Sequence, residues 1–595
     1  MDRAAGPAKP AAFFIEKAAS HGEGGFFLLF ITDQEMIMER TGAEILLNTL
    51  SEEGVSEIFG YPGASTLAIH DCINETGIRH LLVRHEQAAA HAADGYARAT
   101  GKVGVCIATS GPGATNLVTG IATAYMDSTP MIALTGQVTT GLLGSDAFQE
   151  TDIIGITMPI TKHSFLVQDV RDMASTVREA INIATSGRPG PVVIDLPRDV
   201  LAARCNDDEE GGGGFLEQQE IHFGEEELRR LKQIARLLNE SERPVLLVGG
   251  GVKLSQAFTE LADVIQKGNI PFVTTMMGIG SVYTPNGFNL GLIGTHGTDL
   301  ANRIVHQSDF ILAVGARFSD RTTSVIEEFA PLATIAQIDV DPTSIGKNIK
   351  TDISVVSDIR VALQELLGLV TEKKREDWID RIDRERERIA KEGSDDGCGP
   401  AGECIRMVQE CMPEKTIAVT DVGLNQIWAI RSWKVKIPRG LITPGGLGTM
   451  GFSVPASMGA RIGAIDHEVV VFTGDGGFFM NIQELATIGF YNIPVKIVVF
   501  NNGNLGMIRQ IQHHFYNSRY RDSRLSDLVD ITEIAKGFGI PSEKVAAEDP
   551  RKGIEKLCGS EGPFLLEVVV DENNYVYPII PPGKSNVEMI YGRSE

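Results

Sequence analysis

Short apolar runs rich in β-branched residues recur along the chain, and each ends in glycine or a polar residue. Between them lie stretches with helical spacing, such as residues 225–239 and the alanine-rich residues 88–99. Apolar strands that alternate with helices indicate parallel sheets covered by helices on both faces. We therefore predict an α/β fold. The runs expected to form strands are residues 103–109, 131–136, 191–196, 244–248, 310–315, 335–339, 416–421, 469–474, 496–501 and 564–570.

Two polar stretches divide this pattern. Residues 206–214 are acidic and then glycine-only, and residues 372–399 are highly charged, which is typical of a solvent-exposed helix followed by a flexible acidic turn. We predict three domains, each a mostly parallel sheet flanked by helices: 38–205, a Rossmann-like middle domain at 220–370, and 400–595, with a charged linker at 371–399. Residues 1–37 are interpreted as a disordered extension, with Met36 or Met38 as the alternative natural start.

Composition narrows the class of protein. The net charge of −24 over 595 residues argues against nucleic-acid binding, which needs clustered Lys and Arg. The seven cysteines form no CxxC pair, so we expect a reducing compartment, the cytoplasm. The apolar run at residues 26–31 is too short to span a bilayer, and no membrane association is expected.

The first chemical motif joins two successive strand ends. Asp475, within the glycine-rich residues 474–477, follows one strand, and Asn502 follows the next, 27 positions later. Mg²⁺ prefers oxygen ligands and often takes one or two protein groups plus cofactor phosphates. Asp475, the Asn502 amide oxygen and the Asn504 backbone carbonyl supply three such ligands. The glycines allow a diphosphate to approach the backbone at a helix N-terminus. The pattern predicts a magnesium-held diphosphate.

The second motif lies in the first third of the chain, where Glu86 stands between an expected strand and the alanine-rich helix. A glutamate there is ordinarily a partner of the helix dipole. Its setting before residues 95–98 and 109–113 favours a catalytic acid instead. Thiamine chemistry needs a carboxylic acid beside the aminopyrimidine, because that acid promotes loss of the thiazolium C2 proton.

Nearly everything from Met38 to Met589 resembles the acetolactate synthase (acetohydroxyacid synthase) family, catalytic large subunit, among the thiamine-diphosphate enzymes. The stretches that carry the resemblance are residues 60–63, 85–87, 109–116, 146–150, 186–191, 315–318, 446–452, 474–481 and 581–586. The resemblance implies two thiamine-diphosphate-binding folds on either side of an FAD-binding-like middle domain.

The resemblance also assigns residues to the thiamine site. Glu86 is the activating acid, Gln149 and Phe148 line the substrate approach, and Gly63 lies near the reacting centre. Met450 is the apolar wedge that bends the cofactor, and Asp475, Asn502 and Asn504 hold the metal. The other implied thiamine-diphosphate contacts are Gly448, Gly474, Gly476, Gly477, Met480, Leu505, Gly506 and Met507.

For the middle domain the resemblance implies FAD, which has no net redox task and acts largely as a structural element. Strand-end glycines occur in any α/β domain, so the flavin assignment depends on the resemblance. The implied flavin contacts are Gly249, Gly250, Thr275, Met276, His296, Gly315, Arg317, Arg321, Asp339, Val340 and Asp358.

The implied reaction decarboxylates pyruvate on thiamine diphosphate and joins the hydroxyethyl group to a second 2-oxoacid, pyruvate or 2-oxobutanoate. This is the first common step of branched-chain amino acid biosynthesis. The family builds its site between two subunits, so a homodimer is the minimum and a homotetramer is possible, with a small regulatory subunit as a further possible partner. Residues 578–589 are expected to form part of a lid.

Two positions depart from the family pattern. Ile511 stands where the family usually has Trp, which shapes the second-substrate pocket and favours 2-oxobutanoate, so we expect a weaker preference here and poor inhibition by sulfonylurea-type compounds. Leu424 and Asn425 stand where the family usually has Gln and His. Diphosphate contacts there remain open, and Leu424 is expected to contribute only its backbone.

Three alternatives remain. The first is a flavin-free catabolic acetolactate synthase. The second is another thiamine-diphosphate carboligase or acetyltransferase, such as a sulfoacetaldehyde or glyoxylate enzyme. The third is a cofactor-binding regulatory paralogue, which would be expected to lose Glu86 or Asp475, and neither is lost.

Overall fold

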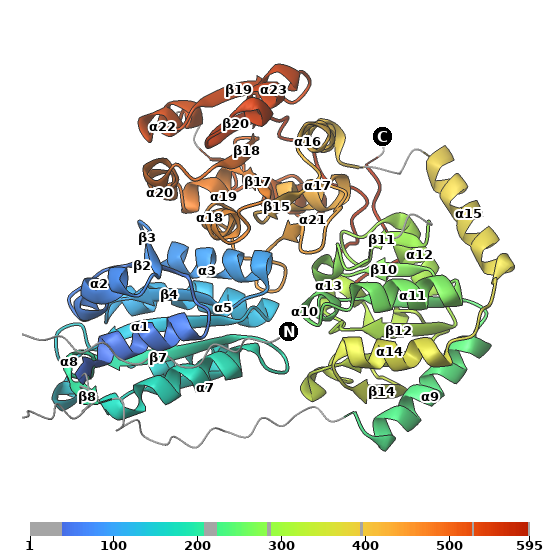
Figure 1. Ribbon diagram of the computed structural model, residues 1–595. Coiled ribbons are helices and arrows are strands. Elements are labelled where there is room, and N and C mark those ends of the chain that lie inside the picture. The colour runs from blue at the N-terminus through green and yellow to red at the C-terminus, as the bar shows by residue number, and fades with distance from the viewer. Residues whose placement is uncertain (1–38, 207–222, 283–286, 393–396, 526–528, 593–595) are drawn as a thin grey trace, which may run out of the picture.

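A computed structural model describes residues 39–206, 223–282, 287–392, 397–525 and 529–592. The expectations for residues 1–37 and for most of the acidic glycine run therefore lie outside the described residues. Within them the chain forms three six-stranded sheets, all parallel, with helices on both faces (Figure 1). The predicted α/β class is confirmed.

The first sheet has the strand order β3-β2-β4-β5-β7-β6. Its strands are β2 (Glu57–Tyr61), β3 (Arg79–Leu82), β4 (Gly104–Ala108), β5 (Met131–Gln137), β6 (His163–Leu166) and β7 (Pro191–Pro197). A two-stranded antiparallel ribbon joins β1 (Glu39–Thr41) to β8 (Arg204–Asn206), so the two ends of this segment meet. Its helices are α1 (Gly42–Glu52), α2 (Leu67–Cys72), α3 (Glu86–Thr100), α4 (Pro112–Asn116), α5 (Val118–Asp127), α6 (Ile153–Thr157), α7 (Met173–Thr185) and α8 (Arg198–Ala202).

The second sheet has the order β11-β10-β9-β12-β13-β14. Its strands are β9 (Pro244–Val248), β10 (Phe272–Thr274), β11 (Asn289–Leu292), β12 (Phe310–Val314), β13 (Thr334–Asp339) and β14 (Ile353–Val356). Its helices are α9 (Glu225–Glu240), α10 (Gly251–Leu254), α11 (Phe258–Gly268), α12 (Asp299–Gln307), α13 (Asp320–Thr323) and α14 (Ile359–Leu369).

The third sheet has the order β16-β15-β17-β18-β20-β19. Its strands are β15 (Thr416–Thr420), β16 (Leu441–Ile442), β17 (Glu468–Gly474), β18 (Val495–Asn501), β19 (Ser542–Ala546) and β20 (Phe564–Val569). Its helices are α16 (Gly399–Cys411), α17 (Leu424–Ser432), α18 (Ser453–Gly463), α19 (Asp475–Met480), α20 (Glu484–Tyr491), α21 (Gly506–Phe515), α22 (Ile531–Gly537) and α23 (Arg551–Gly559). All ten predicted strands are present in the three sheets.

Helices α3 and α18 pack backbone to backbone and join the first sheet to the third (Figure 1). Gly95 and Gly459 make this approach possible: a Cβ on Gly95 would lie 2.0 Å from the Ala456 carbonyl oxygen, and one on Gly459 would lie 1.8 Å from the Ala92 carbonyl oxygen. One apolar core therefore runs from the first sheet through both helices into the third.

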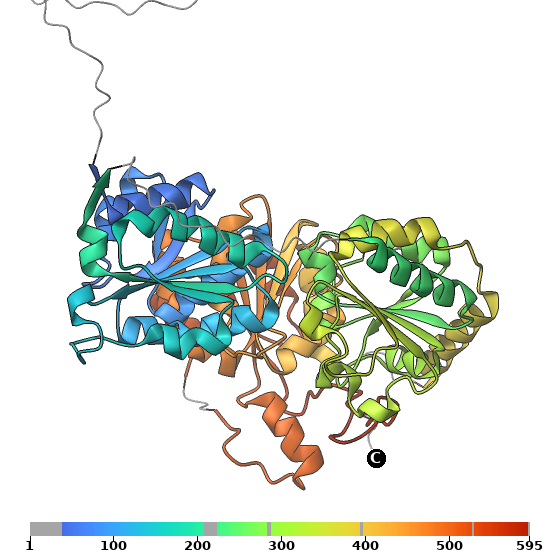
Figure 2. The ribbon, with the colours of Figure 1, turned by 90° about the horizontal axis from the view of Figure 1, so that it is seen from below.

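The charged segment near residue 380 forms a helix, α15 (Glu376–Lys391), as predicted, but not a fully solvent-exposed one. Trp378, Ile382 and Ile389 are buried, and the Trp378 Nε1–H donates to the Pro244 carbonyl at 3.2 Å. The apolar side chains recur at intervals of four and seven along a sequence dominated by charge. One face of the helix therefore packs against the second sheet and its helices, which we call the middle segment; the first and third segments are the parts of the chain that hold the first and third sheets. Figure 2 shows the whole chain from below, with the second sheet and its helices on the right.

The final residues leave the third sheet and cross to the middle segment. The Ile580 N–H donates to the Thr295 carbonyl at 3.1 Å, and the Asn586 Nδ2 donates to the Thr322 carbonyl at 3.1 Å. The predicted lid role of residues 578–589 stays a prediction. Among the helices of the described residues, none combines the length and apolarity needed to cross a bilayer.

Candidate active site

The predicted metal ligands gather at the carboxyl edge of the third sheet. Neighbouring strands β17 and β18 end at Gly474 and Asn501, so Asp475 and Asn502 follow at the same edge. Asp475, Asn502 and Asn504 line one cavity of about 1120 Å³. The edge of a parallel sheet is where ligands bind in such folds.

The charge of Asp475 is not balanced by the protein. Its side chain is buried, and burial raises its pKa to about 7. Among the described residues no ion pair reaches it; the Gly476 N–H donates to its Oδ1 at 3.1 Å. A buried carboxylate that lacks a cation and shares a cavity wall with two asparagines fits a hard divalent ion such as Mg²⁺. Among the described residues, no three His, Cys, Asp or Glu side chains gather as a possible metal site. The ligand set predicted here is of another kind, because it combines one carboxylate with two asparagine oxygens.

Asp421, which the sequence showed only as the end of a strand, organises the wall of this site. Its buried carboxylate accepts hydrogen bonds from the Gly451 N–H at 3.0 Å and from the Ser453 N–H and Oγ at 3.0 and 2.8 Å. A Cβ on Gly477 would lie 2.2 Å from the Asp421 Oδ1, so only glycine fits there. Asp421 thereby holds the loop before α18 against the start of α19.

The two departures at the start of α17 both line the cavity. Asn425 Oδ1 is buried without a hydrogen-bond partner, while its Nδ2 donates to the Val422 carbonyl at 3.0 Å. The Leu424 side chain packs against Gly506, where an added Cβ would lie 2.7 Å from its Cδ1. A buried acceptor without a partner in the wall of a cavity is a group that a ligand could satisfy.

The predicted thiamine contacts divide into two groups. Gly448, Met450, Gly474, Gly476, Gly477, Leu505, Gly506 and Met507 line the cavity, and Ile511 joins them. Met480 does not: it stands at the end of α19 with 53% of its surface exposed, and its Cβ would lie 2.8 Å from a Cβ added to Gly451. The cavity wall formed by this chain alone therefore excludes Met480.

The predicted catalytic residues gather at a separate place, the carboxyl edge of the first sheet. Glu86 begins α3, and the Asn116 Nδ2 donates to its Oε2 at 3.0 Å. Gly63 packs against Thr109, with an added Cβ 2.4 Å from the Thr109 side chain. Gln149 takes a left-handed backbone conformation, with φ of 62°, and Phe148 beside it is 89% exposed.

Neither Glu86 nor its neighbours Gly63, Phe148 and Gln149 lines the cavity that contains Asp475. The structure therefore brings each predicted group together internally, but it does not bring the two groups to one cavity of a single chain. Their separation is a property of the domain packing that no local motif could reveal.

Most predicted flavin contacts line the same cavity as the metal ligands. These are Gly250, Thr275, Met276, His296, Gly315, Arg317, Arg321, Asp339 and Val340. Gly249 instead packs under the wall, where an added Cβ would lie 2.0 Å from the Gly315 carbonyl oxygen. Asp358 is also absent from the wall, because its side chain caps α14 by accepting from the Arg360 and Val361 N–H groups.

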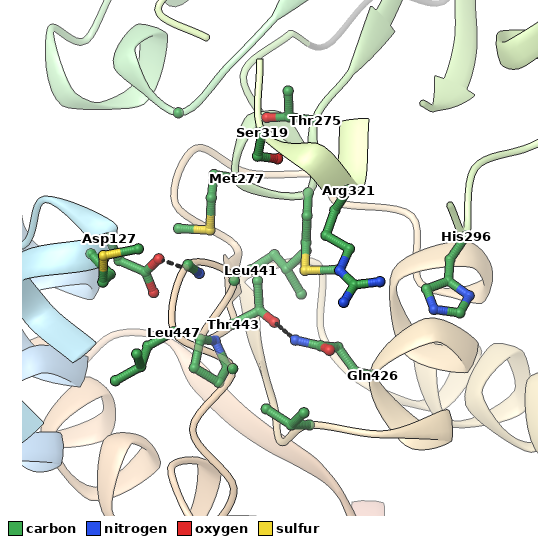
Figure 3. A pocket seen from close by; sticks show the side chains of 18 of the residues that line it. Asp127, Thr275, Met277, His296, Ser319, Arg321, Gln426, Leu441, Thr443 and Leu447 are labelled. Carbon is green, nitrogen blue, oxygen red and sulfur yellow. Dashed lines mark hydrogen bonds between the residues drawn. The ribbon is translucent and has the colours of Figure 1, made fainter. Parts of the chain in front are cut away.

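Figure 3 shows how three segments of the chain meet around the cavity. Arg321 and His296 come from the middle segment, Gln426 and Thr443 from the third, and Asp127 from the first. The Gly446 N–H donates to Asp127 Oδ1 at 2.6 Å, and the Gln426 Nε2 donates to Thr443 Oγ1 at 2.8 Å. Burial lowers the pKa of His296 to about 3, and its Nδ1 has no hydrogen-bond partner.

Several cations of the wall were not predicted. Arg188 donates from Nε to the Ser128 hydroxyl at 2.8 Å and pairs with Asp341 at 3.2 Å. The sequence could have identified Arg188, because it lies in the 186–191 stretch that carries the family resemblance. Arg98 also lines the cavity and ends the 95–98 stretch noted in the sequence, whereas Lys253 and Arg439 line the cavity without any such motif. Together with Arg317, whose Nη2 donates to the Met126 carbonyl at 2.9 Å, they give the wall an affinity for anions.

Comparison with known proteins covers nearly the whole chain. Residues 40–156 match the model of the thiamine pyrophosphate enzyme N-terminal TPP binding domain, residues 231–366 the central domain, and residues 421–568 the C-terminal TPP binding domain.

The relatives that match most of this chain are named acetolactate synthases. The chain is 44% identical over 559 residues to a probable acetolactate synthase large subunit of Methanocaldococcus jannaschii, covering 91% of this chain and 94% of that protein. It is 40% identical over 551 residues to acetolactate synthase isozyme 2 large subunit of Escherichia coli, covering 92% and 99%. It is 41% identical over 570 residues to chloroplastic acetolactate synthase 2 of Nicotiana tabacum, covering 93% and 85%.

Proposed function

The chain belongs to the acetolactate synthase large subunits, a family of thiamine pyrophosphate enzymes, and from this premise we propose that it forms 2-acetohydroxyacids from pyruvate and a second 2-oxoacid. The first molecule loses CO₂, and the remaining two-carbon unit is joined to the carbonyl carbon of the second. This is the first common step towards the branched-chain amino acids. The observation that carries the proposal is the single cavity lined both by Asp475, Asn502 and Asn504 and by the middle-segment positions.

Thiamine diphosphate supplies the electron sink that loss of CO₂ from a 2-oxoacid requires. The residues of this chain hold and orient it. Asp475, Asn502 and Asn504 would hold Mg²⁺ against the diphosphate, and the glycines at 474, 476 and 477 line the same cavity. Met450 and Met507 give the cavity apolar walls, which exclude water from the reacting carbon.

Glu86 is the proton-transfer residue of the proposed reaction. Its carboxyl is oriented by the Asn116 amide, 3.0 Å from Oε2. Because Glu86 does not line the cavity of its own chain, we assign the complete site to two copies, with Glu86 from one and Asp475 from the other. The exposed apolar side chains of Phe148 and Met480 support such a contact. A homodimer is then the smallest active unit, and a homotetramer is compatible with it.

We place FAD in the middle segment as a structural cofactor. The orphaned His296 Nδ1, the Arg317 guanidinium and the glycines at 250 and 315 fit a flavin nucleotide. These positions favour the flavin-containing biosynthetic enzyme over a flavin-free catabolic acetolactate synthase. Other thiamine-dependent carboligases are disfavoured by the 40–44% identity to acetolactate synthases over most of the chain. A non-enzymatic paralogue is disfavoured because both Glu86 and Asp475 are retained.

Further assignments rest on the same premise. Relatives are named large subunits, which supports a small regulatory subunit as a partner. The seven cysteines, which form no CxxC pair, support a reducing compartment, the cytoplasm. The three sheets and the three family matches support domains at 38–205, 220–370 and 400–595.

The test is acetohydroxyacid formation from pyruvate alone, and from pyruvate with 2-oxobutanoate, with thiamine diphosphate, Mg²⁺ and FAD supplied. We expect acetolactate from the wild type and loss of activity in both Glu86→Gln and Asp475→Asn. Glu225→Gln, a carboxylate at the start of α9 and away from the cavity, is the control and retains activity. Release of CO₂ without acetohydroxyacid would contradict the proposal.

Mixing the two inactive variants tests the shared site. In a symmetric dimer, one of the two sites of a mixed pair receives both wild-type residues. Unfolding and refolding a 1:1 mixture should therefore restore about one quarter of the wild-type activity. No recovery in the mixture, with recovery of wild type treated in the same way, would show that each chain builds its own site.

A further inference from the structure

Lys253 is a cation that the described function leaves unused. It lies in α10, two residues after the glycines at the end of β9, and it lines the cavity. Its Nζ donates to the Ile279 carbonyl at 3.3 Å, and no carboxylate pairs with it among the described residues. Lys253 is half-buried and is held by one carbonyl without an opposite charge, whereas charges withdrawn from water are usually paired.

Neighbouring cations increase the local positive charge. Arg439 reaches the Lys253 carbonyl with its Nη2 at 3.4 Å and the Arg98 carbonyl with its Nη1 at 3.3 Å. The backbone of Arg439 is left-handed, with φ of 58°, a conformation that non-glycine residues adopt at a cost. The fold therefore holds a second guanidinium beside Lys253 with backbone carbonyls as its hydrogen-bond partners.

The nearby carboxylates are already occupied. Asp127 accepts from the Arg98 guanidinium at 2.7 Å and from the Gly446 N–H at 2.6 Å, and Asp94 also pairs with Arg98. Two carboxylates thus face three basic side chains, and among the described residues neither Lys253 nor Arg439 has an ion pair of its own. Burial, together with the two neighbouring guanidinium groups, lowers the pKa of Lys253 to about 7. An anion is what this corner of the cavity lacks.

The backbone next to Lys253 is formed by glycines that line the cavity. Gly250 and Gly251 line the cavity, and a Cβ on Gly251 would lie 2.7 Å from the Gly315 Cα, so two strand ends meet without side chains. Such glycine-lined turns allow phosphate oxygens to approach the backbone.

We propose that Lys253, with Arg439 beside it, forms an anion subsite that binds the phosphate oxygens of the flavin nucleotide. The inference rests on the proposed function, which places FAD in this cavity. It adds a contact from residues that carried no motif. Lys253 here is a binding residue, and the chemistry at the thiamine site does not pass through it.

The test measures flavin affinity with the full-length protein, first freed of flavin and then titrated with FAD or with riboflavin, which has no phosphate. Loss of a charge-assisted contact predicts that Lys253→Met and Lys253→Gln raise the Kd for FAD about 10- to 100-fold and leave that for riboflavin within about threefold. Lys267→Met is the matched control: Lys267 also donates to a single carbonyl, that of Leu367 at 2.8 Å, but it does not line the cavity.

Four outcomes would overturn the inference. They are an unchanged FAD affinity in both Lys253 variants, an equal loss for riboflavin, a loss of the same size in Lys267→Met, and a wild type that binds no FAD. A raised KM for pyruvate with intact FAD affinity would assign the subsite to the substrate instead. Acetolactate formation by the wild type is measured separately, so failure of the subsite and failure of the proposed function give different results.

Discussion

The contact between α3 and α18 allows a sharp test of the packing, because it tolerates no side chain at Gly95. An added Cβ would lie 2.0 Å from the Ala456 carbonyl oxygen, whereas ordinary contacts begin at 3.4 Å. The clash is with backbone, so no side-chain rotation relieves it. In Gly95→Ala the two helices would have to separate by about 1.4 Å, which forfeits a large part of the dispersion energy along the contact.

The expected magnitude follows from two opposing effects. Overpacking a core typically costs about 1–3 kcal/mol, and a backbone clash of this depth belongs at or above the upper end. Replacing glycine by alanine inside a helix returns about 1 kcal/mol. We therefore expect Gly95→Ala to lower the free energy of unfolding by about 2 kcal/mol or more.

Gly368→Ala is the control, because Gly368 lies within α14 and an added Cβ there would meet no atom within 4 Å. Only the helix effect remains at this position, so this variant should gain up to about 1 kcal/mol. Both variants are compared with the wild type by urea unfolding followed by circular dichroism. The reasoning is refuted if Gly95→Ala is as stable as the wild type, or if the two variants change in the same direction.

Three further predictions concern single side chains. Ile511→Trp should narrow the cavity and raise the preference for 2-oxobutanoate over pyruvate, measured by competition between the two acceptors; an unchanged product ratio would contradict the role assigned to Ile511. Arg98→Met would leave the buried carboxylates of Asp94 and Asp127 without their cation and should cost about 3–5 kcal/mol in urea unfolding; a loss below about 1 kcal/mol would show that the network is dispensable. Burial, and then the nearby His70, lowers the pKa of His80 from 6.5 to about 4. Between these pH values His80 is protonated in the unfolded chain and neutral in the folded one. The free energy of unfolding therefore falls as the pH is lowered from 6.5 to 4. His80→Phe should reduce that slope by up to about 1.4 kcal/mol per pH unit, measured by urea unfolding at a series of pH values, and an unchanged slope would assign the acid sensitivity to other groups.

The regular part of the fold was predictable because apolar runs without periodicity mark strands buried on both faces. All ten such runs are strands, and the glutamate-rich stretch after residue 224 is α9. Shorter strands, such as β10 and the two-residue β16, carry too few apolar residues to stand out. The buried face of α15 was missed because its three apolar side chains are diluted by charge.

The site was predictable where function depends on strand ends and unpredictable where it depends on packing between segments. Asp475 and Asn502 follow adjacent strands of one sheet, so their proximity follows from the strand order. Asp358 follows a strand too, but its carboxylate caps the next helix. The roles of Asp421 and Lys253 depend on contacts with distant loops, and no short motif records such contacts.

If the proposed thiamine diphosphate and flavin sites share one cavity, binding at the two sites is thermodynamically linked. The loop at residues 443–450 contributes wall on the side of Asp475, through Met450, and hydrogen-bonds on the other side to the first segment through Gly446 and Asp127. A ligand that immobilises this loop from one side reduces the conformational entropy that a ligand on the other side must still remove. The affinities for thiamine diphosphate and for the flavin are then linked, and each changes the other by the same factor.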